Sequence, residues 1–370
     1  MDPVLNKQAE KLIWIAEPSL GKEEYDAVGR CVAENWISQG PRVAEFENAI
    51  AQTAGKTYGS ACNSGTTALH LALHVCDVGP GDEVIIPNLT MIALANAVLL
   101  TGATPVFAES DNDVGNVSLK TVQDCITDRT KAVIIVHTYG EPVKDTVAIS
   151  NLCKGKGIKF IEDCAESHFA LLEGKPVGSF SDLAIFSFYS NKNITTGEGG
   201  MVVTDVLEDK ERLDRVRMHA FTPGKHFCHT ERAFGYRMTD MQAAIGLEQV
   251  KKAPEFMEKR RKYRDMYEEQ MQDLDSVRVP EAVKNSGLWV MPLLANSEEA
   301  RNNIRQHIAD RGIDSRTYFQ PIHRQEFLKD ITDKEYPRSD ELGNCGFYVP
   351  LYPKLEEEQV QYVIDAIKEF

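Results

Sequence analysis

Short apolar runs alternate with longer mixed segments along the first 205 residues. The runs are rich in Val, Ile, Leu and Phe, and they predict strands at residues 83–86, 104–107, 132–137, 159–161, 183–188 and 201–204. The segments between them predict helices at residues 66–76, 91–100, 119–126 and 143–154. This alternation predicts the α/β class, with a mainly parallel sheet and crossover helices.

The pattern changes after about residue 240. A helix over residues 240–252 is expected to stop before Pro254, and a longer charged helix follows at residues 255–271. Further elements are predicted as a strand at 288–294, a helix at 298–311 between Ser297 and Gly312, and a final helix at 356–370. We therefore predict a large domain over residues 1–252, N-terminal arm included, and a smaller C-terminal α/β domain over residues 253–370.

Composition narrows the class of protein. The 41 Lys and Arg residues against 56 Asp and Glu residues give a net charge of −15, which argues against nonspecific binding to nucleic acid or membranes. The nine histidines show no zinc-site spacing, so no metal site is expected. The eight cysteines form no Cys-x-x-Cys pair and are typical of reduced thiols. With no signal peptide predicted at residues 1–4 and no apolar stretch long enough to span a bilayer, we expect a cytoplasmic protein.

A single lysine, Lys192, stands between the apolar run at residues 183–189 and a glycine-rich turn. Gly197, Gly199 and Gly200 permit positive φ and close backbone approach. Such a lysine is either an ordinary surface cation or an amine held against a cofactor, and its neighbours favour the second interpretation. Lysine is the residue that bonds covalently to carbonyl substrates and to pyridoxal phosphate.

Two other segments carry candidate chemistry. Asp163 ends the predicted strand at 159–161, at the edge of the sheet where ligands of open α/β folds bind. It could pair with the ring nitrogen of pyridoxal phosphate, or with Glu162 it could simply form a turn or helix cap. Small and hydroxyl residues at 61–67 open a helix whose exposed amides could bind phosphate, although Ser64 or Thr66 could equally be an ordinary N-cap.

With these motifs in this order, the chain resembles the sugar-nucleotide aminotransferases of the DegT/DnrJ/EryC1/StrS family. The resembling segments are residues 18–24, 36–41, 63–73, 79–87, 136–140, 161–166, 186–204, 236–239 and 242–247. The resemblance implies the fold of type I pyridoxal-phosphate aminotransferases, with a mainly parallel seven-stranded sheet in the large domain. It also implies a homodimer with active sites shared between subunits.

The resemblance assigns roles to individual residues. Lys192 would bind pyridoxal phosphate covalently and then move protons, and Asp163 would stabilise the protonated ring nitrogen. The implied cofactor-binding residues are Gly65, Thr66, Thr67, Met91, Asp163, Glu166, Ser187 and Lys192. Three further residues are candidates for substrate binding: Arg237, His323 and Ser190.

The segment Ser-Asn-Lys-Asn-Ile-Thr-Thr-Gly-Glu-Gly-Gly at residues 190–200 is most similar to GDP-perosamine synthases. Those enzymes aminate C4 of a nucleotide-linked 4-keto-6-deoxy sugar with glutamate as donor. UDP- or dTDP-linked sugars, amination at C3, and a non-catalytic sugar-nucleotide-binding protein on the same scaffold remain alternatives. Related dehydratases carry histidine in place of the lysine, so Lys192 argues against that activity.

Two positions depart from the family pattern. Many members place an aromatic residue over the cofactor ring where this chain has Met91, whose thioether can also cover a ring face. Many also have an asparagine that reaches the neighbouring subunit's cofactor phosphate, where this chain has Gly235. A backbone amide or Arg237 would have to replace that contact.

Overall fold

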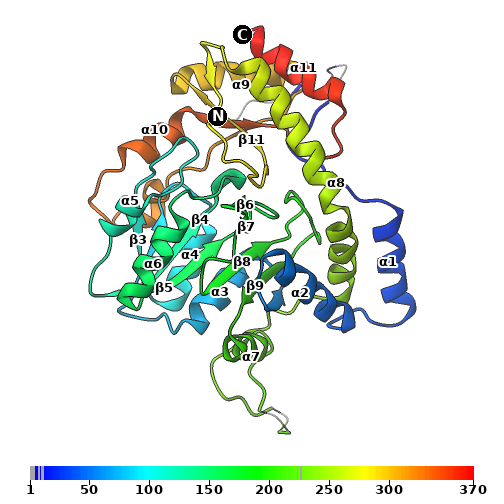
Figure 1. The fold of residues 1–370 in the computed structure, drawn as a ribbon, viewed down its shortest axis with the longest axis vertical. Coiled ribbons are helices and arrows are strands. Elements are labelled where there is room, and N and C mark those ends of the chain that lie inside the picture. The colour runs from blue at the N-terminus through cyan, green and yellow to red at the C-terminus, as the bar shows by residue number, and fades with distance from the viewer. Residues whose placement is uncertain (1–4, 7–8, 10–11, 223, 226) are drawn as a thin grey trace.

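The computed structural model describes residues 5–6, 9, 12–222, 224–225 and 227–370, which form a larger unit and a smaller one (Figure 1). Residues 1–4, on which the expectation of no signal peptide rests, lie outside this part of the chain. Within it, no helix is both long enough and apolar enough to cross a membrane.

A seven-stranded sheet forms the centre of the larger unit, in the order β1-β9-β8-β5-β4-β2-β3. Its strands are β1 (Tyr58–Cys62), β2 (Glu83–Pro87), β3 (Thr104–Ala108), β4 (Thr130–Val136), β5 (Lys159–Asp163), β8 (Leu183–Ser187) and β9 (Gly200–Thr204). Strands β3, β2, β4, β5 and β8 are parallel, and β9 runs antiparallel to both β8 and β1. Parallel strands covered on both faces are continuously apolar, which is why the sequence pattern predicted most of them. The mainly parallel seven-stranded sheet is confirmed.

Helices cover both faces of this sheet (Figure 1). On one face lie α3 (Gly65–Val75), α4 (Ala93–Thr101) and α7 (Leu207–Val216). On the other lie α2 (Pro41–Thr53), α5 (Leu119–Gln123), α6 (Thr146–Lys156) and the first half of α8 (Asp240–Met271), against which α1 (Lys22–Ala33) packs. In β8, Leu183 and Ile185 enter the first core while Ala184 and Phe186 enter the second. Because successive side chains of a strand point to opposite faces, this alternation sets the face to which each residue at the end of β8 points.

The smaller unit is built on an antiparallel sheet in the order β10-β11-β13-β12. Its strands are β10 (Val277–Arg278), β11 (Met291–Ala295), β12 (Arg316–Thr317) and β13 (Gly346–Val349). Its helices are α9 (Glu298–Asp310), α10 (Pro337–Cys345) and α11 (Glu357–Lys368), with the 3-10 turns η2 (Ile322–Arg324) and η3 (Glu326–Leu328). The remaining short elements, β6 (Leu171–Leu172), β7 (Lys175–Pro176) and η1 (Thr138–Gly140), belong to the larger unit.

The predicted helix break at Pro254 is wrong. A single helix, α8, runs from Asp240 to Met271 with Pro254 inside it, and it connects the larger unit to α11 of the smaller one (Figure 1). Pro254 removes one backbone hydrogen bond, but Ala253, Phe256 and Met257 are buried beside it. Their packing holds the helix together across the proline. The boundary that we propose between residues 252 and 253 therefore falls within a continuous helix.

The sequence pattern did not predict α1, α2, β1, β6, β7, α7, β10, β12, α10 or β13. Other elements differ at their ends, and the strand predicted at 288–294 begins only at Met291. Leu288 has a left-handed backbone (φ 49°), which no regular strand accommodates. The helices predicted at 91–100 and 143–154 begin later, at Ala93 and Thr146.

Candidate active site

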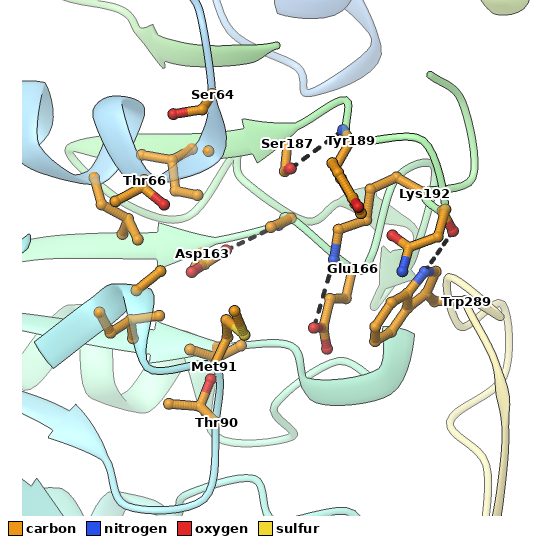
Figure 2. Close-up of a pocket in the computed structure, with 18 of the residues that line it drawn as sticks. Ser64, Thr66, Thr90, Met91, Asp163, Glu166, Ser187, Tyr189, Lys192 and Trp289 are labelled. Carbon is orange, nitrogen blue, oxygen red and sulfur yellow. Dashed lines mark hydrogen bonds and ion pairs between the residues drawn. The ribbon is translucent and has the colours of Figure 1, made fainter. Parts of the chain in front are cut away.

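A cavity of about 400 Å³ lies where the carboxyl ends of β5 and β8 meet the N-terminus of α3 (Figure 2). Ligands of open α/β sheets bind at this edge. The smaller unit contributes Trp289, Phe319 and Tyr348 to the opposite wall. Most of the predicted cofactor-binding residues line this one cavity: Gly65, Thr66, Met91, Asp163, Glu166, Ser187 and Lys192.

Lys192 lies in the loop between β8 and β9 and its side chain reaches into the cavity (Figure 2). Its backbone N–H donates to the carbonyl of Tyr189 at 2.9 Å, which closes the turn. Its Nζ lies 3.6 Å from Oε1 of Glu166 and 4.0 Å from the centre of the Trp289 ring. The side chain is only 11% exposed. This amine is therefore held toward the cavity, where a ligand would meet it before solvent does.

Two glycines allow the lysine loop to approach the start of α3. A Cβ on Gly200 would lie 2.1 Å from the carbonyl oxygen of Ser64, and a Cβ on Gly65 would lie 2.8 Å from Cβ of Ser187. Neither distance is sterically possible, so only glycine permits this close packing. The glycine-rich turn therefore brings the ends of β8 and β9 against the N-terminus of α3.

The N-terminus of α3 offers free backbone amides to the cavity. Oγ of Ser64 accepts the N–H of Thr67 at 3.2 Å, and Oγ1 of Thr67 donates to Oδ1 of Asn63 at 2.8 Å. Thr67 is thus engaged in the helix cap and does not line the cavity, unlike Gly65 and Thr66. The first amides of a helix have no intrahelical acceptor and carry the positive end of its dipole. They can hold an anion such as phosphate.

Asp163 ends β5 and is buried beneath the cavity. One carboxylate oxygen accepts the N–H of Ala165 at 2.9 Å. Burial is the main cause that raises the pKa of this carboxyl to about 7; Glu166 adds to the rise, while the N–H of Ala165 and the charge of Lys192 oppose it. A buried carboxylate is costly unless a cation or a donor pairs with it. Asp163 can therefore hold a protonated ring nitrogen of a ligand in the cavity.

Glu166 lies between the lysine and the turn that follows β4. Its Oε2 accepts the backbone N–H of Tyr139 at 2.8 Å, while Oε1 faces Lys192. Tyr139 has a left-handed backbone (φ 56°) and lies in the turn that this carboxylate binds. Burial raises the pKa of the Glu166 carboxyl, and Lys192 opposes that shift. Glu166 thus binds the turn at Tyr139 through one oxygen and lies beside the amine of Lys192 with the other.

Met91 lines the cavity beside Thr90, with 49% of its surface exposed (Figure 2). It is therefore a wall residue and not part of the core. Ser187 lies across the cavity, and its Oγ accepts the N–H of Tyr189 at 3.4 Å.

The three predicted substrate-binding residues are not among those lining the cavity of this single chain. His323 joins the two units: its backbone N–H donates to Oδ1 of Asn88 at 3.1 Å, and its Nε2 lies 3.3 Å from Asp340. Arg237 is exposed, and its backbone forms an isolated antiparallel β-bridge with Cys62. Ser190 is half-buried. Gly235, at the departure from the family pattern, is exposed on the same segment as Arg237.

Sequence reasoning missed the aromatic wall formed by Trp289, Phe319 and Tyr348. Trp289 donates its indole N–H to the carbonyl of Asn191 at 2.8 Å, although the two residues are 98 positions apart. Trp289 lies in the run at residues 288–294 that was predicted as a regular strand. Alternation within a strand indicates only which face of the sheet a side chain points to. No local signal indicated that this side faces Lys192.

Among the described residues, one buried cluster has metal-ligating side chains: His137, Glu162 and Cys164. Its polar groups are already used. Nδ1 of His137 accepts the N–H of Val143 at 3.0 Å, and its Nε2 lies 3.1 Å from Glu162, which also accepts the N–H of Gly178 at 2.8 Å. This cluster is a hydrogen-bonded brace between β4, β5 and the loop before β8.

Comparison with known proteins gives one consistent family. The sequence model of the DegT/DnrJ/EryC1/StrS aminotransferase family matches residues 18–368. A GDP-perosamine synthase from Escherichia coli O157:H7 is 39% identical over 361 residues, which cover 97% of this chain and 99% of that protein. A second, from Caulobacter vibrioides, is 37% identical over 96% of this chain and 97% of that protein. The structure of a Streptococcus pneumoniae protein named as a sugar aminotransferase, in its PLP form, superposes with a TM-score of 0.92 at 26% identity, covering 97% of this chain and 98% of that one.

Proposed function

Because this chain belongs to the DegT/DnrJ/EryC1/StrS aminotransferase family, we propose that it transfers an amino group from glutamate to C4 of a nucleotide-linked 4-keto-6-deoxy sugar. The observation that carries the proposal is the similarity, over nearly the whole chain, to two GDP-perosamine synthases. The cavity supports it by placing Lys192 and Asp163 together at the carboxyl edge of the sheet. GDP-4-keto-6-deoxymannose is the first substrate to test.

The cofactor of this aminotransferase is pyridoxal phosphate, and the residues of the cavity fit it. The free amides of Gly65 and Thr66 would hold its phosphate. Asp163 is buried and accepts the backbone N–H of Ala165, and its carboxylate would pair with the ring nitrogen. Met91 would cover a face of the ring, and Lys192 would bind the aldehyde carbon.

Bound pyridoxal phosphate accepts the electron pair that is released when a proton leaves the substrate carbon. The chain moves that proton: Nζ of Lys192 would act as the general base and then as the general acid. Asp163 would keep the ring nitrogen protonated, and Glu166, 3.6 Å from Nζ, would orient the amine. The aromatic wall from the smaller unit would exclude water from one side of the reacting atoms.

The choice of sugar rests on the relatives and not on a contact within the cavity. Ser190, which the resemblance made a candidate for substrate binding, is not a lining residue of this chain, whereas the neighbouring Asn191 is. A sugar nucleotide is larger than pyridoxal phosphate and would extend from the cavity toward the surface. We propose a homodimer with shared sites and a cytoplasmic location, as the family resemblance implies. Sedimentation of the purified chain would test the homodimer. A monomer at assay concentration would contradict it.

The decisive experiment is turnover with glutamate and GDP-4-keto-6-deoxymannose, read by mass spectrometry. The expected products are the 4-amino sugar nucleotide and 2-oxoglutarate in equal amounts. Parallel incubations with UDP- and dTDP-linked 4-keto sugars and with a 3-keto sugar nucleotide test the alternatives. Rapid turnover of a 3-keto substrate, with none of the GDP-linked sugar, would overturn both the base and the regiochemistry. Sugar binding without any 2-oxoglutarate release would indicate a non-catalytic binding protein.

A further inference from the structure

Trp289 contacts the amine of Lys192 through the face of its ring. The Nζ of Lys192 lies 4.0 Å from the ring centroid, within the range in which an aromatic face attracts a cation. Trp289 is 5% exposed and the lysine side chain is 11% exposed, so water screens this contact poorly. The indole N–H also donates to the carbonyl of Asn191, the residue before the lysine (Figure 2).

The backbone that carries Trp289 is fixed from several sides. The N–H of Gly287 donates to the carbonyl of Gly140 at 2.6 Å, and Asn193 donates its side-chain amide to the carbonyl of Gly287. From behind, Arg260 of α8 donates to the carbonyls of Leu288 and Trp289, each at 2.9 Å.

Gly140 itself has a left-handed backbone (φ 94°), and a Cβ there would lie 2.8 Å from the backbone nitrogens of residues 288 and 289. This packing leaves the indole little freedom to move away from the lysine. A ring used only to fill space would not need its backbone tied to the lysine loop on one side and to α8 on the other.

We infer that Trp289 is a positioning residue for the catalytic amine, whose ring face holds the charged form of Lys192 in the cavity whenever the lysine is not covalently bound. The inference rests on the proposed role of Lys192 in transamination. A free lysine has four rotatable bonds and would otherwise leave the reacting carbon or pair fully with a carboxylate. The ring attracts the ammonium without offering it a proton acceptor, so the amine stays available for proton transfer.

Other groups also act on this amine, and the test must separate them from the ring. The titratable groups that face it from the surrounding elements are Asp163, Glu166, His168, Tyr189, Glu198 and Tyr348. Substitution of Trp289 leaves all of these in place. Fluorination of the tryptophan ring is sharper still, because fluorine withdraws electron density from the ring face while the shape of the side chain changes little.

The experiment measures the rate constant for acylation of Lys192 as a function of pH in the full-length chain with the cofactor removed, read on the Lys192 peptide by mass spectrometry, and takes as midpoint the pH at which the rate is half its plateau value. Access to the site scales the plateau rate, whereas the charge on the amine sets the midpoint pH. Without the ring face the charged amine is less stable, so Trp289→Leu should lower the midpoint by roughly 0.5 to 1.5 pH units, a three- to thirtyfold change in proton binding. Trp289→Phe keeps a weaker ring face and should give a midpoint between those of the wild type and Trp289→Leu.

Fluorotryptophan incorporation keeps the test decisive if Trp289→Leu does not fold. The midpoint pH for acylation of Lys192 should fall stepwise as fluorine atoms are added to the indole. Incorporation of fluorotryptophan into Trp289→Phe should leave the midpoint of that variant unchanged. That background controls for Trp14 and Trp36, which are both exposed. An unchanged midpoint in the fluorinated protein, or an equal shift in Trp289→Phe and Trp289→Leu, would overturn the inference. Labelling needs no sugar, so failure to turn over the GDP-linked substrate would refute the proposed function and leave this result standing.

Discussion

Replacing Asp163 with asparagine should stabilise the cofactor-free chain at neutral pH while removing most of its activity. Asp163 is 3% exposed, and burial raises the pKa of its carboxyl from 3.8 to about 7. Ionised Asp163 is therefore unfavourable for folding until a partner such as a protonated ring nitrogen arrives. Asparagine has nearly the same shape and never ionises, so it removes this penalty and also the pairing with the ring nitrogen.

The magnitude follows from the difference between the folded and unfolded pKa values. Because the folded pKa is the higher one, the folded chain keeps the proton between pH 3.8 and about 7 while the unfolded chain loses it. The stabilisation is fully present below pH 3.8, decreases as the pH rises, and is lost above about 7. About three pH units at ~1.4 kcal/mol each give about 4 kcal/mol as an upper limit. Relaxation around the charge reduces it, so we expect about 1–3 kcal/mol.

The assay is denaturant unfolding of the cofactor-free wild type and Asp163→Asn at pH 5 and pH 8. The variant should gain stability over the wild type as the pH rises, and Asp124→Asn, at a 61% exposed side chain, should not. Turnover of the loaded Asp163→Asn enzyme should fall by about a hundredfold or more, since an amide cannot stabilise a positive ring. If Asp163→Asn followed the wild type at both pH values, Asp163 would not carry the predicted penalty. Native turnover would leave it as a strand-end cap.

Three further substitutions test other parts of the site. Lys192→Ala should abolish transamination, and borohydride reduction of the wild type should place the cofactor on the Lys192 peptide; near-native turnover of the variant would disprove the assignment. Met91→Phe should keep the melting temperature and tighten cofactor binding by about 1 kcal/mol, because Met91 is a cavity wall residue; a loss of stability without a change in affinity would place it in the core instead. His323→Ala should cost about 1–3 kcal/mol of stability, since its ring Nδ1 lies 2.8 Å from the side chain of Asn88 in the larger unit and its Nε2 lies 3.3 Å from Asp340, and should leave the KM for the sugar within about twofold; a large KM increase would show that it binds substrate.

The elements that sequence reasoning predicted well have local causes. Strands β2, β8 and β9 are buried on both faces, so each appears as a continuous apolar run between polar turns. The glycines around Lys192 are also local signals, and the structure explains two of them by contacts that a Cβ would prevent. The N-terminus of α3 was open to two interpretations: Ser64 is its N-cap, bonded to Thr67, while Gly65 and Thr66 line the cavity, where phosphate binding stays a prediction.

Other features depend on distant neighbours. Pro254 is a helix breaker by its own chemistry, yet α8 continues because buried residues beside it pack against other elements. The resemblance made His323 a candidate for substrate binding, which stays a prediction, and the fold brings Asn88, just after β2, against its ring. Neither feature could be predicted from the residues adjacent in sequence to Pro254 or His323.

The sequence by itself determined the fold class and the family, and it pointed to an amine, a carboxylate and a helix N-terminus that the structure brings to one cavity, because each of these depends on residues that are neighbours along the chain. Only the tertiary structure decided that Trp289 covers the amine of Lys192, that Glu166 stands between Lys192 and the turn at Tyr139, and that burial raises the pKa of Asp163 to about 7. Those properties come from distances between segments far apart in the sequence and from the exclusion of water around them. Burial and through-space contact belong to the packed chain and have no local pattern from which they can be predicted.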